Sequence, residues 1–206
     1  MRADRRISLA AGMLAAALLA AAPSRAQGSE PDIDAATGYR VRNYRAPVNL
    51  PVRGGTRVGL AEVDRLRGEG AAMIDVMPQR GGYDPETGAW RIVDRRDTIP
   101  GAVWLPETGR GTIEPRLSAY LAAWLSRLSG GDPGRPLVFF CRADCWMSWN
   151  AVRRAADLGY RRVYWFAEGT DGWSEAERPL ERASPPPVPL AADRPGERPA
   201  EPSDGP

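Results

Sequence analysis

Short runs of apolar residues alternate along this chain with segments whose apolar positions recur at helical spacing. The runs are continuous, which is typical of strands buried on both faces of a parallel sheet. Such strands are expected at residues 72–77, 136–140 and 163–166. Apolar residues three or four positions apart predict helices at residues 60–67, at 117–128 and from Met147 to Leu158.

The connecting segments are rich in glycine, proline and other turn residues. Residues 38–55 are expected to form an extended arm with turns, and residues 81–96 a loop or loose hairpin. Residues 99–106 predict a turn followed by a further strand. Because strands and helices alternate on this scale, we predict a single α/β domain with a central, mostly parallel sheet flanked by helices.

The first 26 residues have the three parts of a secretory signal. A basic start with Arg2, Arg5 and Arg6 precedes an apolar stretch at residues 7–22, and a small residue, Ala26, stands at the expected cleavage position. An N-terminal membrane anchor is the alternative, although Pro23 and the alanine-rich composition favour cleavage. We therefore expect a periplasmic protein that is not inserted in the membrane after cleavage.

The two ends bound the folded part of the chain. Residues 27–56 are expected to form an N-terminal arm, and residues 57–181 the α/β domain. From residue 182 to residue 206 the chain is rich in proline and charge and poor in apolar residues, which predicts a disordered tail.

The only two cysteines, Cys141 and Cys145, lie in one short loop between a predicted strand and a predicted helix. Cys141 follows the strand directly, and ligands of open α/β sheets bind at this carboxyl edge. The helix N-terminus just beyond it offers free backbone N–H groups and a positive dipole end, which lower the pKa of a thiol. We therefore expect a reactive thiolate here.

The composition excludes much of the alternative chemistry. The chain has no histidine, and all 28 basic residues are arginine, so catalytic Cys-His pairs, lysine Schiff bases and P-loops are ruled out. Two cysteines without histidine make a structural zinc site improbable, and no metal site is predicted. Without residues 1–26 the chain has 24 arginines and 25 acidic residues, a formal charge of −1, so no nucleic-acid partner is implied.

Several short motifs, in order and at consistent spacing, resemble those of the rhodanese family. They are Met73-Ile74-Asp75-Val76, Ile99-Pro100-Gly101-Ala102, Phe139-Phe140-Cys141-Arg142, and Gly169-Thr170-Asp171-Gly172-Trp173 with Pro179-Leu180. The resemblance covers about residues 58–180. It implies a rhodanese-like fold in which Cys141 is the catalytic cysteine and sulfur transfer is the family's reaction.

A narrower resemblance rests on the run from Cys141 through Cys145 and Trp146 to Asn150, and on residues 164–173. These runs are similar to a periplasmic rhodanese-like subgroup associated with pyrroloquinoline quinone (PQQ)-dependent alcohol catabolism. The resemblance implies a pathway and candidate partners: a quinoprotein dehydrogenase, a cytochrome or a thiol-disulfide partner. It does not imply that this chain binds the quinone, and no cofactor is predicted.

The cysteine loop departs from the family pattern in two ways. Active rhodaneses end this loop with an arginine five residues after the cysteine, and related phosphatases have one six residues after it; here Trp146 and Met147 occupy these positions. Asp144 adds negative charge, and Arg142 is expected to point elsewhere, so thiosulfate should bind weakly and a phosphatase reaction is disfavoured. The loop's backbone N–H groups, at Arg142, Ala143 and the residues up to Met147, remain as a nest for an anionic sulfur.

Cys145 is the second departure. Two cysteines four residues apart can form a disulfide in an oxidising compartment if their Cα atoms lie within about 4.4–6.8 Å. The bond is either a structural staple or a labile, exchange-ready pair. Trp146 is expected either to shield the sulfurs or to face a partner. Asp75 and Asp171 are candidates for the edge of the site, with hydrogen-bonded or turn roles as the simpler interpretation, and Glu168 is expected in the same loop as Asp171.

Three hypotheses follow. In the first, Cys141 accepts sulfane sulfur or attacks a disulfide, and Cys145 resolves the product. In the second, the chain is a non-catalytic accessory module that binds a quinoprotein dehydrogenase system through its arm and the Trp146-Met147 loop. The third, weaker hypothesis is an ordinary sulfurtransferase that uses thiosulfate or cyanide.

Overall fold

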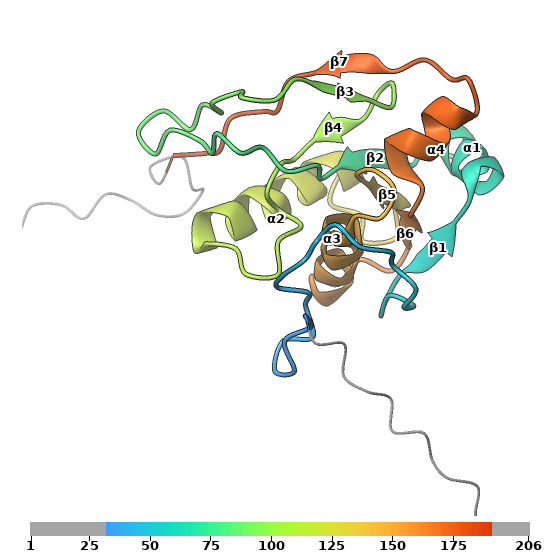
Figure 1. Cartoon of the computed structure of the whole chain (residues 1–206), viewed down its shortest axis with the longest axis horizontal. Helices are drawn as coiled ribbons and strands as arrows, with labels where there is room; N and C mark the ends of the chain where they lie inside the picture. Colours follow the sequence, from blue (N-terminus) through green and yellow to red (C-terminus); the bar gives the residue numbers. More distant parts are fainter. Residues whose placement is uncertain (1–31, 191–206) are drawn as a thin grey trace, which may run out of the picture.

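A computed structural model describes residues 32–190 and shows an α/β domain built on a five-stranded parallel sheet (Figure 1). The sheet order is β1-β6-β5-β2-β4, and every neighbouring pair is parallel. The strands are β1 (Thr56–Val58), β2 (Ala72–Asp75), β4 (Val103–Trp104), β5 (Leu137–Phe140) and β6 (Val163–Phe166). The predicted fold class is confirmed.

Four helices cover the two faces of this sheet. They are α1 (Leu60–Gly68), α2 (Pro115–Ser129), α3 (Trp146–Asp157) and α4 (Gly169–Glu175). Helices α2 and α3 pack with Ile74 and Phe139 in one core cluster, whereas α1 and α4 pack with Met73 and Phe140 in the other. Successive strand residues therefore face opposite layers, which explains why β2 and β5 are continuously apolar.

The sequence pattern predicted the buried elements and missed an edge strand. Strands β2, β5 and β6 and helices α1, α2 and α3 lie where the pattern placed them. The segment 169–175, expected to be part of a loop, is helix α4 instead. Strand β1 was not predicted and crosses the expected boundary between the arm (27–56) and the domain (57–181). It pairs with β6 at the sheet edge, and only its last residue, Val58, is buried, so it carries no apolar run.

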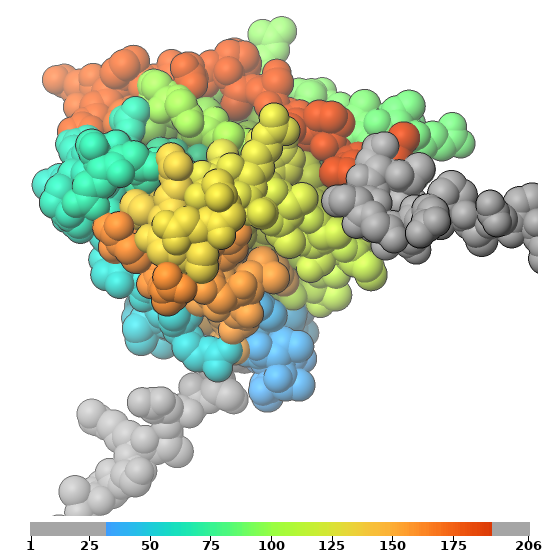
Figure 2. Space-filling model, turned by 180° about the vertical axis from the view of Figure 1, so that it is seen from behind, coloured from blue at the N-terminus to red at the C-terminus, as the bar shows by residue number. Residues whose placement is uncertain are grey.

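The predicted boundary of the disordered tail is wrong for residues 182–190. Strand β7 (Glu181–Ala183) pairs with β3 (Arg96–Thr98) in a two-stranded antiparallel sheet. Beyond it, the Pro186 carbonyl accepts hydrogen bonds from Trp90 Nε1 and Tyr120 Oη, both 2.9 Å long, and Val188 is 1% exposed. Figure 2 shows this red segment lying against green and yellow-green parts of the surface.

The arm is extended, as predicted, up to β1. Isolated bridges join Ile33 to Arg40 and Arg45 to Cys145, so the arm runs over the end of α3 rather than away from the domain. Within residues 32–190, no helix has the length and apolar character needed to cross a membrane. The predicted signal at residues 1–26 and the remainder of the predicted tail lie outside the described residues.

Candidate active site

The cysteine loop joins β5 to α3 at the carboxyl edge of the parallel sheet. Cys141 follows the last residue of β5, and Cys145 is the N-cap residue of α3. The two cysteines form a disulfide with their Cα atoms 6.6 Å apart, inside the range that a disulfide allows. The structure thus brings together the two predicted catalytic residues, in their oxidised form.

Both sulfur-bearing residues are buried, but not equally. Cys141 is 0% exposed and Cys145 is 3% exposed. The hydroxyl oxygen of Ser148 lies 3.4 Å from Cys141 Sγ; this hydroxyl accepts a hydrogen bond from Trp165 Nε1 and donates one to the Cys145 carbonyl, each 3.1 Å long. Ser148 therefore offers a polar group that can turn toward a Cys141 thiolate after reduction.

The carbonyl oxygen of Cys141 is held by three donors. Arg96 Nη2 donates at 2.9 Å, and the backbone N–H and hydroxyl of Thr170 donate at 3.1 Å and 3.2 Å. Gly169, with φ of 56°, permits this approach, because a Cβ there would lie 2.7 Å from the same oxygen. These contacts fix the backbone of Cys141 where the strand ends.

Asp75 lies beneath the loop as a fully buried carboxylate. It accepts hydrogen bonds from Arg96 Nε at 2.7 Å, from the Thr98 hydroxyl at 2.6 Å and from the Met77 N–H at 2.9 Å. Burial raises the pKa of the Asp75 carboxyl, and the charge and hydrogen bonds of Arg96, followed by Thr98 and Met77, oppose that rise. Asp75 thus supports the cysteine backbone through Arg96, and it is not exposed for proton transfer.

The N-terminal arm covers one side of the loop. The Tyr44 carbonyl accepts a hydrogen bond of 2.9 Å from the backbone N–H of Trp146, and Arg45 donates to the Ala143 carbonyl. The first N–H of α3 is therefore occupied by the arm. The predicted nest of loop N–H groups lacks the Trp146 member in this state.

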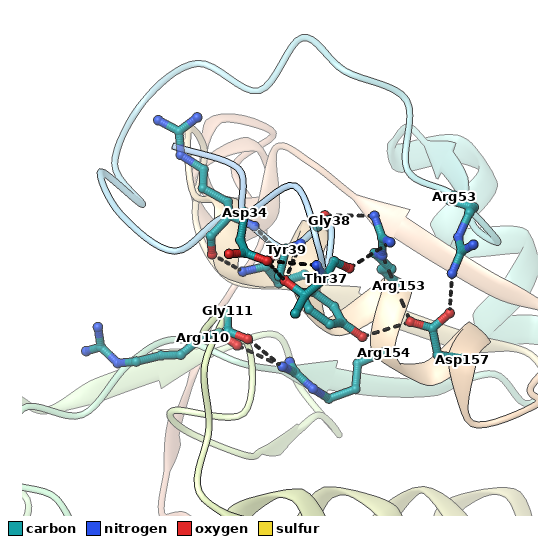
Figure 3. Close-up of polar contacts among 12 residues, drawn as sticks. Asp34, Thr37, Gly38, Tyr39, Arg53, Arg110, Gly111, Arg153, Arg154 and Asp157 are labelled. Carbon is teal, nitrogen blue, oxygen red and sulfur yellow. Dashed lines mark hydrogen bonds and ion pairs between the residues drawn. The ribbon is translucent and has the colours of Figure 1, made fainter. Parts of the chain in front are cut away.

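Helix α3 anchors the arm through a set of arginine and amide contacts (Figure 3). Arg153 donates to the carbonyls of Thr37 and Gly38, and Tyr39 donates to Asp157 at 2.8 Å. The side-chain amide of buried Asn150 accepts a hydrogen bond from the Arg40 N–H and donates to the carbonyls of Arg40 and Gly109, with distances of 2.8–3.0 Å. The arm is consequently part of the domain and fixes one wall of the site.

Arg154 ties the neighbouring loop to the same helix. Its guanidinium donates to the carbonyls of Thr108, Arg110 and Gly111 at 3.0–3.1 Å. Burial lowers the pKa of Arg154, and the charges of Tyr39 and Asp157 oppose this change. Five donors in a fixed fork suit arginine to this clasp.

Trp146 and Met147 do not form an exposed surface. Each is 1% exposed, and the Trp146 ring packs against Trp149, at a centroid distance of 5.3 Å, and under the Arg40 guanidinium at 4.3 Å. The expectation that Trp146 faces a partner is wrong, because the arm covers the position. Its aromatic ring instead joins the arm to α3 through a cation–π contact.

The remaining predicted residues lie around the tip of the loop. Asp144 is exposed and has φ of 51°, a left-handed conformation that aspartate tolerates in a turn. Arg142 lies near Asp171, with 3.9 Å between Nε and Oδ2, and both side chains are partly exposed. Glu168 pairs with Arg57 at 3.2 Å, so it does not join this cluster.

A pocket of about 340 Å³ opens beside Cys145. Its apolar walls come from Tyr44, Met77, Pro78 and Met147, and Asn43, Arg45 and Arg110 add polar groups. Cys141 does not line this pocket. Of the two cysteines, Cys145 is therefore the one next to this pocket.

Sequence reasoning missed Ser148, Arg96 and the arm residue Tyr44. A hydroxyl one turn into the helix after a cysteine was a readable signal for Ser148. Arg96 lies 45 positions before Cys141, and no local pattern marks that contact. Among the described residues, no cluster of histidine, cysteine or acidic side chains is suited to hold a metal ion.

Solved structures resemble this chain in part. The wild-type EanB structure aligns with a TM-score of 0.43 at 23% identity, over 63% of this chain and 32% of EanB. An EanB variant bearing a cysteine persulfide with ergothioneine gives 0.43 at 24% identity with the same coverage. The anaerobic ergothioneine biosynthesis enzyme from Chlorobium limicola, in complex with trimethyl histidine, gives 0.41 at 22% identity, again over 63% and 32%.

The chain thus spans about a third of the length of these structures. No curated protein matches it. A family model described as the rhodanese-like domain matches residues 60–176, which is more than half of the chain and includes the strand, the cysteine loop and the helix described above. The chain belongs to the rhodanese-like domain family.

Proposed function

We propose that the Cys141–Cys145 pair takes sulfane sulfur from a persulfide donor and passes through the disulfide seen in the structure. The observation that carries this proposal is the bond between a cysteine at the end of β5 and the N-cap cysteine of α3. A rhodanese with one reactive cysteine has no internal thiol with which to resolve its persulfide. This chain has one, four residues away.

The proposed cycle begins with both thiols reduced. The Cys141 thiolate attacks the outer sulfur of a persulfide R–S–SH, so that a Cys141 persulfide forms and R–S⁻ leaves. The Cys145 thiolate then attacks Cys141 Sγ; the Cys141–Cys145 bond forms, and hydrosulfide leaves with the electron pair of the broken sulfur–sulfur bond. The transferred sulfur is reduced to sulfide, and the two cysteines are oxidised to the disulfide.

The surroundings of Cys141 support its role as the sulfur acceptor. The positive end of α3 and the Ser148 hydroxyl both stabilise a thiolate relative to a thiol. In contrast, Trp146 is buried where an arginine would bind the oxygens of thiosulfate, and Arg142 lies near Asp171. A persulfide donor, which needs no oxyanion clamp, fits this loop better than thiosulfate does.

The proposal places the protein in the periplasm, after removal of a signal at residues 1–26. An oxidising compartment suits a protein that rests as a disulfide. Its neighbours would be a thiol-disulfide partner and, by resemblance to the PQQ-associated subgroup, a cytochrome or quinoprotein dehydrogenase. The chain itself is proposed to work without a bound cofactor.

A redox titration of the mature protein tests the proposal. Equilibration in defined thiol–disulfide buffers, alkylation and mass spectrometry give the potential of the pair, which we expect near −200 mV or above. The reduced protein should release sulfide from glutathione persulfide with one disulfide formed per sulfide. Cys145→Ser should accumulate a Cys141 persulfide. Cys141→Ser should neither accumulate a persulfide nor release sulfide. A potential below about −300 mV without sulfide release would contradict the proposal.

The burial of both sulfurs favours a second candidate, a non-catalytic accessory module in which the disulfide is a structural staple. Since Trp146 and Met147 are buried, the module would bind through the outer face of the arm. Complementation separates the two: a folded Cys141→Ser protein that restores full function in cells would support binding, and loss of function would support thiol chemistry.

A further inference from the structure

We propose that the disulfide is reduced from the Cys145 side, by a thiolate that enters the pocket of Tyr44, Met77 and Met147, and that Cys141 is the leaving group. This inference rests on the proposed function, because it describes how the reduced pair is regenerated. It assigns the two sulfurs different tasks: Cys141 accepts sulfane sulfur, and Cys145 accepts the reductant.

Access distinguishes the two sulfurs. Cys141 is 0% exposed, whereas Cys145, 3% exposed, lines the pocket of about 340 Å³. The Cys141 carbonyl is held by Arg96 and Thr170, so the strand end on which it sits has little freedom to turn its sulfur outward. A thiolate attacks a sulfur that it can reach, and of the two cysteines Cys145 is the one that lines a pocket.

The leaving group points to the same assignment. Exchange is faster when the departing thiol has the lower pKa. The Ser148 oxygen lies 3.4 Å from Cys141 Sγ, and Trp165 Nε1 donates to that same oxygen, which polarises the hydroxyl. The Ser148 proton, now directed to the Cys145 carbonyl, can rotate to the new Cys141 thiolate. Attack at Cys145 therefore releases a thiolate that has a hydroxyl donor beside it.

The charge of the pocket suits an anionic nucleophile. Arg45 and Arg110 both line it, and no aspartate or glutamate is among its lining residues in the described chain. Arg110 is paired with Glu107 outside the lining, whereas Arg45 contacts the Ala143 carbonyl of the loop itself and feels the charges of Arg142, Asp171 and Asp144 without a direct ion pair to them among the described residues. Arg45 is thus the residue that can raise the local concentration of a thiolate.

The electron balance requires two thiols from the reductant. The first thiolate forms a bond with Cys145 Sγ, the Cys141–Cys145 bond breaks, and Cys141 leaves as a thiolate. A second thiolate, from the same dithiol or from another monothiol, attacks the reductant's sulfur in this mixed disulfide and releases Cys145. The reductant leaves as a disulfide, and the protein has gained two electrons.

The position of the mixed disulfide can be mapped directly. The full mature chain in its oxidised form is treated with 2-mercaptoethanol and, in parallel, with 2-mercaptoethanesulfonate; it is acid-quenched at short times and alkylated. Trypsin cuts after Arg142, between the two cysteines, so each sulfur is read in its own peptide. We expect the earliest adduct on the Cys145 peptide and the alkyl group on Cys141, after extrapolation to zero time.

An earliest adduct on Cys141 would overturn the inference and leave the exchange activity intact. No adduct with either thiol, together with a potential below about −300 mV, would instead contradict the proposed function. The two failures are therefore distinguishable in one set of samples.

A charge variant tests the part assigned to Arg45. Arg45→Gln should slow reduction by the doubly anionic mercaptoethanesulfonate roughly threefold to tenfold more than reduction by mercaptoethanol. The matched control is Arg135→Gln, an exposed arginine beside the start of β5, at the opposite sheet edge; it should leave both rates unchanged. An equal fall of both rates in Arg45→Gln would overturn the electrostatic assignment.

Discussion

The Asp75–Arg96 pair gives the sharpest test of how the site is supported. Arg96→Met removes the donor at 2.7 Å from Asp75 and the donor at 2.9 Å from the Cys141 carbonyl. Asp75 is 0% exposed and Arg96 is 11% exposed at the side chain, so the carboxylate would stay buried with only Thr98 and Met77 as partners. Breaking a buried pair from one side costs about 3–5 kcal/mol of unfolding free energy, and we expect a loss in this range at pH 7.

The pH dependence of this loss has a defined sign. Without the Arg96 charge, burial raises the folded-state pKa of Asp75 further above the unfolded value of about 3.9. A raised acid pKa contributes stability that is fully present below the unfolded pKa and is lost as pH rises through the folded pKa. The deficit of Arg96→Met relative to the wild type should therefore shrink as the pH falls from 7 toward 4.

Urea unfolding, followed by tryptophan fluorescence at several pH values, measures both effects. Asp75→Asn with Arg96→Met should cost less than the two single changes summed, because no buried charge remains. Arg80→Met is the matched control, since Arg80 pairs with Asp94 at the surface, and its removal should change stability little. The reasoning is refuted if Arg96→Met loses no more than Arg80→Met, or if its deficit grows toward acid pH.

Three further predictions concern other parts of the structure. Ser148→Ala should lower the reduction potential of the pair by roughly 30 mV, because the Cys141 thiolate loses a hydrogen bond of about 1.5 kcal/mol; a titration in thiol–disulfide buffers measures this. Val188→Ala should reduce the unfolding free energy by about 1–2 kcal/mol, whereas the control Val93→Ala, at an exposed position, should leave it unchanged. Urea titration measures both. Asn150→Ala removes three hydrogen bonds to backbone groups of Arg40 and Gly109, and faster amide exchange in residues 37–46 should report the loosened arm.

The buried sheet was predictable because its strands have no exposed face. Every residue of β2 and β5 is buried, and both strands stand out as apolar runs. Strands β1 and β7 gave no such signal, since only Val58 among their residues is buried. The pattern thus missed strands whose residues are mostly exposed, β1 and β7, whereas the other edge strand, β4, lies within the predicted residues 99–106.

The C-terminal boundary was misplaced for a related reason. Residues 184–190 are mostly proline. The Pro186 carbonyl accepts from Trp90 and Tyr120, the Pro189 carbonyl accepts from Arg116, and the buried Val188 donates its N–H to the Gly88 carbonyl. A proline carbonyl remains a full acceptor although the residue has no N–H. Composition alone predicts that such a segment cannot form a hydrophobic core. Here the segment forms none and instead packs against the core of the domain.

The site shows the same division between local and distant information. The two cysteines, the strand before them and the helix after them were readable from a dozen consecutive residues. Arg96, Thr170 and Tyr44 come from three other segments, and each contributes through a backbone hydrogen bond that no residue pattern records. The sequence therefore placed the two cysteines together, whereas the contacts that bury them depended on the fold.

The hydrogen bonds around the loop are distributed unevenly, and this bears on how a buried disulfide can exchange. Cys141 is held by Arg96 and Thr170, whereas the residues after it are held largely by the arm: Arg45 donates to the Ala143 carbonyl and bridges to Cys145, and the Tyr44 carbonyl accepts from the Trp146 N–H. If the pair reacts as proposed, exchange at Cys145 is expected to depend on the arm residues Tyr44 and Arg45, whereas the contacts of Cys141 with Arg96 and Thr170 belong to the domain itself. The arm, rather than the sheet, would then decide when the buried disulfide can be reached.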